Sequence, residues 1–243
     1  MTRLTTSARQ SPRRVIALFA AMFAAVFVSG CEYSANEDID VPADTAHSGD
    51  GMTMNGDVTI GRNADASGSS FRTMNGRITI KDGARVSDCA TVNGAVNVGE
   101  GAEAGDLKTV NGDLDLGREA RVNGSIKLVN GSVRLNKGSS VSGDIGTVNG
   151  RIELVTAEVG GDLSNVNGGM LVTAGSLVHG GIRIRDADGD PMGEPPRIVI
   201  GPASEVRGKL QFERDVELFV HETAHIGPVS GATAVSFAGD EPG

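Results

Sequence analysis

Apolar and polar residues alternate in short phrases that recur along most of the chain. In the segment 148–154, apolar Val148, Ile152 and Leu154 are separated by polar residues and one glycine. This alternation is typical of a half-buried β-strand. The phrase recurs with its last apolar residue at Ile60, Ile80, Val98, Leu116, Leu135, Leu154, Val172, Ile200 and Val220. A further small or apolar residue, such as Ala66 or Val159, follows most phrases, so each repeat predicts two or three short strands.

The dipeptide Asn-Gly marks the same repeat at steps of 18 to 20 residues. Its asparagines are Asn55, Asn75, Asn93, Asn111, Asn130, Asn149 and Asn167. A fixed period of this size is typical of a solenoid. We expect each dipeptide to turn a corner of a coil with a positive φ, which Gly or Asn adopts at low cost. Stacked Asn amides would then form a hydrogen-bonded ladder; a ligand-binding row of amides is the alternative.

The direction of the repeat selects the fold class. A βαβ unit needs a crossover of a dozen or more residues, and the gaps here are shorter. Asn-Gly is also a hairpin signal, but hairpins would give mirrored strand patterns, whereas every unit here reads in the same direction. We therefore predict an all-β, single-stranded parallel β-helix (β-solenoid) of about nine coils of 18–20 residues. Parallel crossovers favour the right-handed form.

Four segments are expected outside or within this solenoid, which spans residues 51–238. Residues 1–30 carry four arginines and then an uncharged apolar run, which indicates a cleaved export signal. Residues 31–50 are acidic and poor in apolar groups, so we expect a flexible tether. Residues 186–196 exceed the period and are rich in Pro, Gly and Asp, which predicts a loop insertion. Residues 239–243 form a C-terminal tail.

The end of the export signal adds a candidate modification site. Val28-Ser-Gly-Cys31 resembles the cleavage motif of bacterial lipoproteins. The resemblance implies cleavage before Cys31 and attachment of lipid acyl chains to it. Glu32, rather than Asp, follows the cysteine, and this implies the outer membrane. An ordinary secreted protein with a free Cys31 is the alternative, and Arg13-Arg14 leaves twin-arginine export open.

Charge and composition narrow the partners. The whole chain has a net charge of −9. Residues 1–30 contain no acid, so the chain beyond them has 18 basic and 31 acidic residues and a net charge of −13. Such a field repels nucleic acid and anionic lipid. Aromatic platforms for bases or sugars are scarce, because the chain has no Trp and one Tyr.

Three motifs bear on metal or thiol chemistry, and none predicts a catalytic residue or a metal site. His221-Glu-Thr-Ala-His225 matches a zinc-protease pattern, but that chemistry needs a helix, and the motif falls at a coil corner. Asp186, Asp188 and Asp190 have the spacing of a calcium loop without its Gly and bidentate Glu. Cys89 is expected to be a small buried side chain. No cofactor is predicted.

Three phrases in the solenoid resemble one known family. Residues 120–126, 140–145 and 158–163 (Ala-Arg-Val-Asn-Gly-Ser-Ile, Ser-Val-Ser-Gly-Asp-Ile and Glu-Val-Gly-Gly-Asp-Leu) are similar to bactofilins, the polymer-forming bacterial cytoskeletal β-helices. The resemblance spans residues 52–237 and implies self-assembly through the coil ends without a nucleotide. The lipoprotein signal and the Asn-Gly corner depart from that family.

These observations favour a non-catalytic, lipid-anchored solenoid with a structural role in the bacterial cell envelope. Its expected partners are the membrane, through the lipid, and further copies of the chain, through the coil ends. The alternative is an adhesin-like binding module for polysaccharide, peptidoglycan or a protein. An enzyme is the third class.

Overall fold

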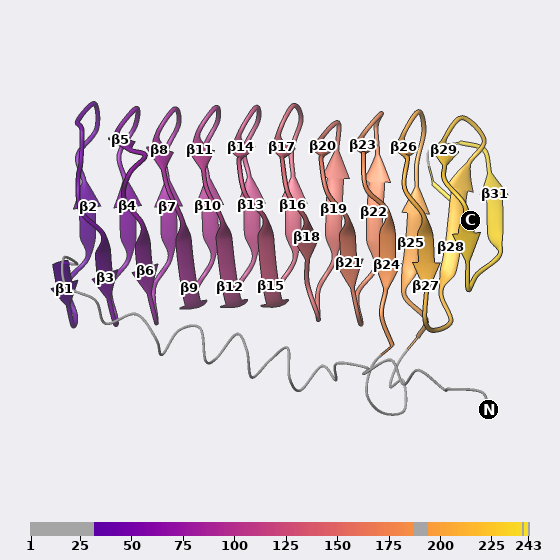
Figure 1. The fold of residues 1–243 in the computed structure, drawn as a ribbon, viewed down its shortest axis with the longest axis horizontal. Coiled ribbons are helices and arrows are strands. Elements are labelled where there is room, and N and C mark those ends of the chain that lie inside the picture. Colours follow the sequence, from indigo (N-terminus) through magenta and orange to yellow (C-terminus); the bar gives the residue numbers. More distant parts are fainter. Residues whose placement is uncertain (1–31, 187–193, 240, 243) are drawn as a thin grey trace, which may run out of the picture.

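The computed structural model describes residues 32–186, 194–239 and 241–242. In this part the chain forms an all-β parallel β-solenoid of about ten turns, without helices. Coils are stacked in sequence order along one axis, and three parallel sheets run the length of the rod (Figure 1). The predicted fold class is therefore confirmed.

Sheets A and B each contain 11 strands within the described residues. Sheet A consists of β1 (Glu32–Ser34), β3 (Gly51–Thr53), β6 (Phe71–Thr73), β9 (Cys89–Asn93), β12 (Leu107–Asn111), β15 (Ile126–Asn130), β18 (Ile145–Gly146), β21 (Leu163–Asn165), β24 (Ile182–Ile184), β27 (Leu210–Phe212) and β30 (Val229–Ser230). Sheet B consists of β2 (Ile39–Val41), β4 (Val58–Ile60), β7 (Ile78–Ile80), β10 (Val96–Val98), β13 (Leu114–Leu116), β16 (Val133–Leu135), β19 (Ile152–Val155), β22 (Met170–Thr173), β25 (Arg197–Ile200), β28 (Glu217–His221) and β31 (Ala234–Phe237).

Sheet C is narrower, with nine strands of two residues each in the described chain. They are β5 (Asp65–Ala66), β8 (Arg85–Val86), β11 (Glu103–Ala104), β14 (Arg121–Val122), β17 (Ser140–Val141), β20 (Glu158–Val159), β23 (Leu177–Val178), β26 (Glu205–Val206) and β29 (His225–Ile226). The small or apolar residue that follows each strand phrase in the sequence faces inward here. Val159 and Ala66, for example, are fully buried.

In-register pairing builds the core. Leu116 pairs with Leu135, and Leu135 pairs with Leu154, so equivalent residues of successive coils stack directly. All three side chains are fully buried. The predicted internal aliphatic ladder is thereby confirmed from Ile60 to Ile200, and at the last coil Val220 is only partly buried. Each strand contributes alternate residues to this core, which leaves the others on the outer faces.

The predicted flexible tether is wrong for residues 32–50. β1 pairs with β3 and β2 pairs with β4, so this segment forms a coil of the rod. Val41 is buried in the core, and Ile39 packs against it. An isolated acidic segment cannot bury enough apolar surface to fold, but stacking on an existing coil supplies partners for its backbone. Cys31 and the predicted export signal lie outside the described residues.

The predicted loop insertion lies between two well-paired coils. β22 pairs with β25 across it in sheet B, and β24 pairs with β27 in sheet A. Residues 187–193, which include Asp188 and Asp190 of the calcium-like motif, lie outside the described part of the chain.

Candidate functional site

The Asn-Gly asparagines form one continuous row at the corner between sheets A and B. From Asn75 to Asn167, each Nδ2 donates to the Oδ1 of the asparagine one coil earlier at 2.7–2.9 Å. Asn55 continues the row to Asn36, at 2.7 Å. Sequence reasoning missed Asn36 because Glu37, not glycine, follows it. Its position 19 residues before Asn55 was the available signal.

The row has a direction, and its C-terminal end is capped by a cation. Because every amide donates toward the N-terminal end, the last acceptor is Oδ1 of Asn167. Arg214 Nη1 donates to this oxygen at 3.0 Å. A positive charge at the acceptor end of aligned amide dipoles is favourable, as it is at the C-terminus of a helix.

The expected positive φ occurs at Gly150, at 156°, and is wrong for the other six Asn-Gly glycines. A Cβ on Gly76 would collide with the carbonyl oxygen of Gly56, and the same collision recurs at Gly94, Gly112, Gly131, Gly150 and Gly168 with the preceding coil. Glycine is therefore required here because the coils approach closely.

Positive φ occurs mainly at the corner between sheets B and C. The residues there include Asp44 at 57°, Asn63 at 53°, Gly83 at 67° and Gly138 at 76°. Glycine recurs at this corner as Gly83, Gly101, Gly138 and Gly175, but other residue types occupy it in the remaining coils, so the sequence analysis did not single it out. The left-handed turn of the coil is thus separate from the corner that the Asn-Gly dipeptide marks.

A second internal row consists of threonines two residues before the asparagine. Its members are Thr53, Thr73, Thr91, Thr109 and Thr147, all of which are buried. The hydroxyl of Thr73 donates to the carbonyl oxygen of Gly56 at 2.9 Å, and that of Thr91 donates to Gly76 at 2.9 Å. Thr109 and Thr147 repeat the contact. Sequence analysis missed this row, although Thr-x-Asn-Gly recurs in the chain.

Aspartates at the corner leading into sheet A bond successive coils. Oδ1 of Asp106 accepts the Ser125 N–H, and Oδ1 of Asp162 accepts the Gly181 N–H, at 2.8 and 2.7 Å. Partial burial raises the pKa of Asp106, but the N–H of Ser125 and the Lys108 ammonium, 2.9 Å away, together hold the pKa below its ordinary value. These carboxylates therefore cap backbone amides.

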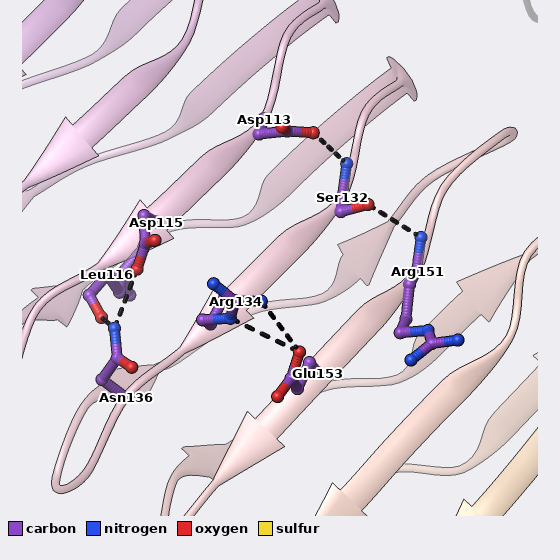
Figure 2. Close-up of polar contacts among 8 residues, drawn as sticks. All are labelled: Asp113, Asp115, Leu116, Ser132, Arg134, Asn136, Arg151 and Glu153. Carbon is purple, nitrogen blue, oxygen red and sulfur yellow. Dashed lines mark hydrogen bonds and ion pairs between the residues drawn. The ribbon is translucent and has the colours of Figure 1, made fainter.

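The corner leading into sheet B and the outer face of that sheet have a similar arrangement (Figure 2). Oδ1 of Asp113 accepts the Ser132 N–H at 2.8 Å, and Oγ of Ser132 accepts the Arg151 N–H at 3.2 Å. Arg134 and Glu153 form an ion pair at 3.3 Å. The polar groups drawn there join one coil to the next.

The zinc-like motif spans a coil corner. His221 lies in β28 of sheet B and His225 in β29 of sheet C, so the two do not share a helix face. Nδ1 of His221 lies 2.9 Å from Thr223 Oγ1 and accepts the Thr223 N–H at 3.1 Å, while its ring contacts Phe237 edge-on. The described residues contain no cluster of three or more potential metal ligands.

Cys89 is buried, as predicted. It lies in β9, and its side chain is 1% exposed. Burial raises the pKa of its thiol to about 12, so the thiol stays protonated and unreactive at neutral pH.

No family model, curated protein or solved structure matches this chain. Within the described residues, no helix is long and apolar enough to cross a membrane.

Proposed function

We propose that this chain is a non-catalytic, lipid-anchored β-solenoid with a scaffold role in the bacterial cell envelope. The observation that carries the proposal is the use of its repeated polar residues. The Asn, Thr and Asp rows bond one coil to the next, so these residues stabilise a rod along its whole length. A solenoid of this kind is quasi-one-dimensional and offers long faces to its surroundings.

The anchor is supported by the Val28-Ser-Gly-Cys31 motif. Each buried CH₂ of an acyl chain contributes about 0.8 kcal/mol, and two or more chains anchor a protein stably. Glu32 after the cysteine favours the outer membrane as the destination.

The test is the fate of Cys31→Ser in cells. Wild-type protein should be lipidated on Cys31, as measured by mass spectrometry of its N-terminal peptide, and should fractionate with membranes. Cys31→Ser should be unprocessed or soluble, whereas the control Cys89→Ser should remain lipidated. Normal processing of Cys31→Ser with continued partition into detergent would refute the anchor.

A binding module is the second candidate, and one surface favours it. Leu171, Val199, Phe219 and Val235 occupy matching outward positions on four successive strands of sheet B. Val235 is 52% exposed. Leu171, Val199 and Phe219 are partly exposed. A partly exposed apolar row of this kind favours a protein partner over a polysaccharide. A photo-crosslinking residue at Val199 should then capture one specific envelope protein, and the same residue at Thr79, on the polar half of this face, should not.

A further inference from the structure

The three outer faces of the rod differ in charge. Outward positions of sheet B carry Asp40, Asp115 and Glu153 together with Arg134, and those of sheet C carry Asp65, Glu103, Glu158 and Glu205 together with Arg85 and Arg121, so acids outnumber cations on both. From β3 to β24, all within the described residues, the outward positions of the sheet A strands carry no acid. This is unusual in a chain with a net charge of −13 beyond residue 30.

Two rows of side chains make up this acid-free face. The first contains the cations Arg72, Lys108, Lys127 and Arg183, on matching positions of β6, β12, β15 and β24. The second lies beside the Asn ladder and consists of Met54, Met74, Val92, Val110, Val129, Val148 and Val166. The face is therefore aliphatic along one side and cationic along the other.

The apolar row is most accessible toward the N-terminal end of the rod. Met74 is 36% exposed and Met54 is partly exposed, whereas Val129 and Val166 are nearly covered. Met74 and Val235 are the large apolar side chains that are exposed in the described chain, and Val235 lies at the opposite end of the rod.

Aspartates lie along one edge of this face, at the corner leading into sheet A, and partly neutralise its positive charge. Asp106 pairs with Lys108 at 2.9 Å, and Asp162 lies 3.9 Å from Arg183. Lys127 is exposed and forms no ion pair among the described residues within 4.0 Å. The face is thus complementary to a phospholipid surface, in which phosphates cover an apolar interior. The outer faces of sheets B and C, on which acids outnumber cations, are not.

The position of the first strand relative to the proposed anchor is the second observation. β1 belongs to sheet A and starts at Glu32, so Cys31 immediately precedes the first strand of this sheet. Without a tether, acyl chains on Cys31 would enter the bilayer at the N-terminal end of the acid-free face. We propose that the outer face of sheet A is a membrane-contact face, on which the rod lies against phospholipid; this rests on the lipid anchor proposed above. A lipid chain and a cationic patch together bind more firmly than either alone.

The test uses the lipidated full-length mature protein in vesicles of equal parts phosphatidylethanolamine and phosphatidylglycerol. A bimane label is placed at Met74→Cys, and the matched control is Thr79→Cys in β7 of the same coil, on sheet B. Buried Cys89 should not react with the label. Brominated phospholipid should quench the label at residue 74 several-fold more than the label at residue 79.

A charge reversal provides a second readout. Lys127→Glu should reduce the quenching at residue 74, and it should do so less in vesicles of phosphatidylcholine alone. The exposed Lys137, at the corner after sheet B, gives the control Lys137→Glu, which should have no effect. Equal quenching at residues 74 and 79, or equal effects of the two reversals, overturns the proposal.

Failure of the anchor is scored separately by mass spectrometry of the N-terminal peptide. A protein that is lipidated but unquenched at residue 74 keeps the anchor and refutes the contact face. A protein that is not lipidated in cells refutes the anchor itself, and the proposed contact face with it. Crosslinking from residue 74 in cells to a protein in place of lipid would also refute the contact face.

Discussion

At the scale of single residues, the closest contacts of this rod are between backbones of neighbouring coils. A methyl group at Gly112 would meet the carbonyl oxygen of Gly94, which cannot move without disturbing the next coil. Gly112→Ala should therefore destabilise the protein by about 1–3 kcal/mol, the range for overpacked sites. Gly68 is exposed with open space around its Cβ position, so Gly68→Ala is the matched control. Denaturant unfolding compares them, and equal midpoints would contradict the packing argument.

The buried threonines allow a second test at this scale. Thr91→Val keeps the shape of the side chain but leaves the carbonyl oxygen of Gly76 without the hydroxyl that now donates to it. The expected loss of unfolding free energy is about 1–2 kcal/mol. Thr91→Ser retains the donor and should lose less. Leu128 occupies the equivalent position one coil after Thr109, so the rod tolerates the absence of this hydroxyl in one coil. A Thr91→Val variant more stable than wild type would show that the hydrogen bond contributes no stability.

Acid stability has a contribution from Asp106. Its folded-state pKa lies below the ordinary value of about 3.9, so it stabilises the fold above that pH and loses this contribution as pH falls through the folded-state pKa. The side chain is 35% exposed, which limits the effect to about 1 kcal/mol or less. Asp106→Asn should therefore narrow the stability difference between pH 6 and pH 3, as followed by urea midpoints. Lys108→Gln keeps the Asp106 carboxylate and should narrow the stability difference between pH 6 and pH 3 less. If that difference is unchanged in Asp106→Asn, titration of Asp106 does not contribute to acid stability.

At the scale of the repeating element, each ladder asparagine from Asn55 to Asn167 both donates and accepts a side-chain hydrogen bond, and all these bonds run in the same direction along the rod. Asn111→Asp replaces the amide that donates to Asn93 with an oxygen, so two acceptors face each other. Asn111→Ala removes both bonds without this repulsion. We expect both variants to be destabilised, by about 1 kcal/mol for Ala and by more for Asp. Hydrogen exchange of the Asn93 and Asn130 backbone amides should report the loss, and greater stability of the Asp variant would contradict it.

Features that depend on the order of residues along the chain could be predicted from the sequence, and features that depend on contacts between stacked coils could not. The aliphatic alternation and the regular spacing of Asn are of the first kind, so the fold and the Asn row followed from the sequence. The need for glycine at Gly76 arises from Gly56, 20 residues earlier, and only the stacked backbone shows it. The coil at residues 32–50 was missed because Glu37 replaces glycine there, although Asn36 and Val41 keep the period. Thr73 was overlooked because its partner is a backbone oxygen in another coil.

At the scale of the whole molecule, both ends of the described rod bear on assembly. At the C-terminal end, β31 pairs only with β28, and its other edge has unpaired backbone groups in the described chain. Ala234, Val235 and Ser236 on this strand are exposed. Such an edge invites another strand. The opposite end is the coil that contains Glu37, Asp38 and Asp40, and it is acidic.

Head-to-tail stacking would join these two ends and would extend into a filament. It would also bring the acidic first coil against Glu217 and Glu222 of the last coils, so repulsion opposes the contact. We therefore expect residues 32–243, produced without lipid and with the first coil intact, to be mainly monomeric at physiological salt. Association should increase at high salt, because screening weakens this repulsion. Light scattering across a salt series measures this, with Val235→Lys as the variant that should suppress the association. Filaments that form at low salt and dissolve at high salt would contradict the charge argument and favour the bactofilin-like mode of assembly.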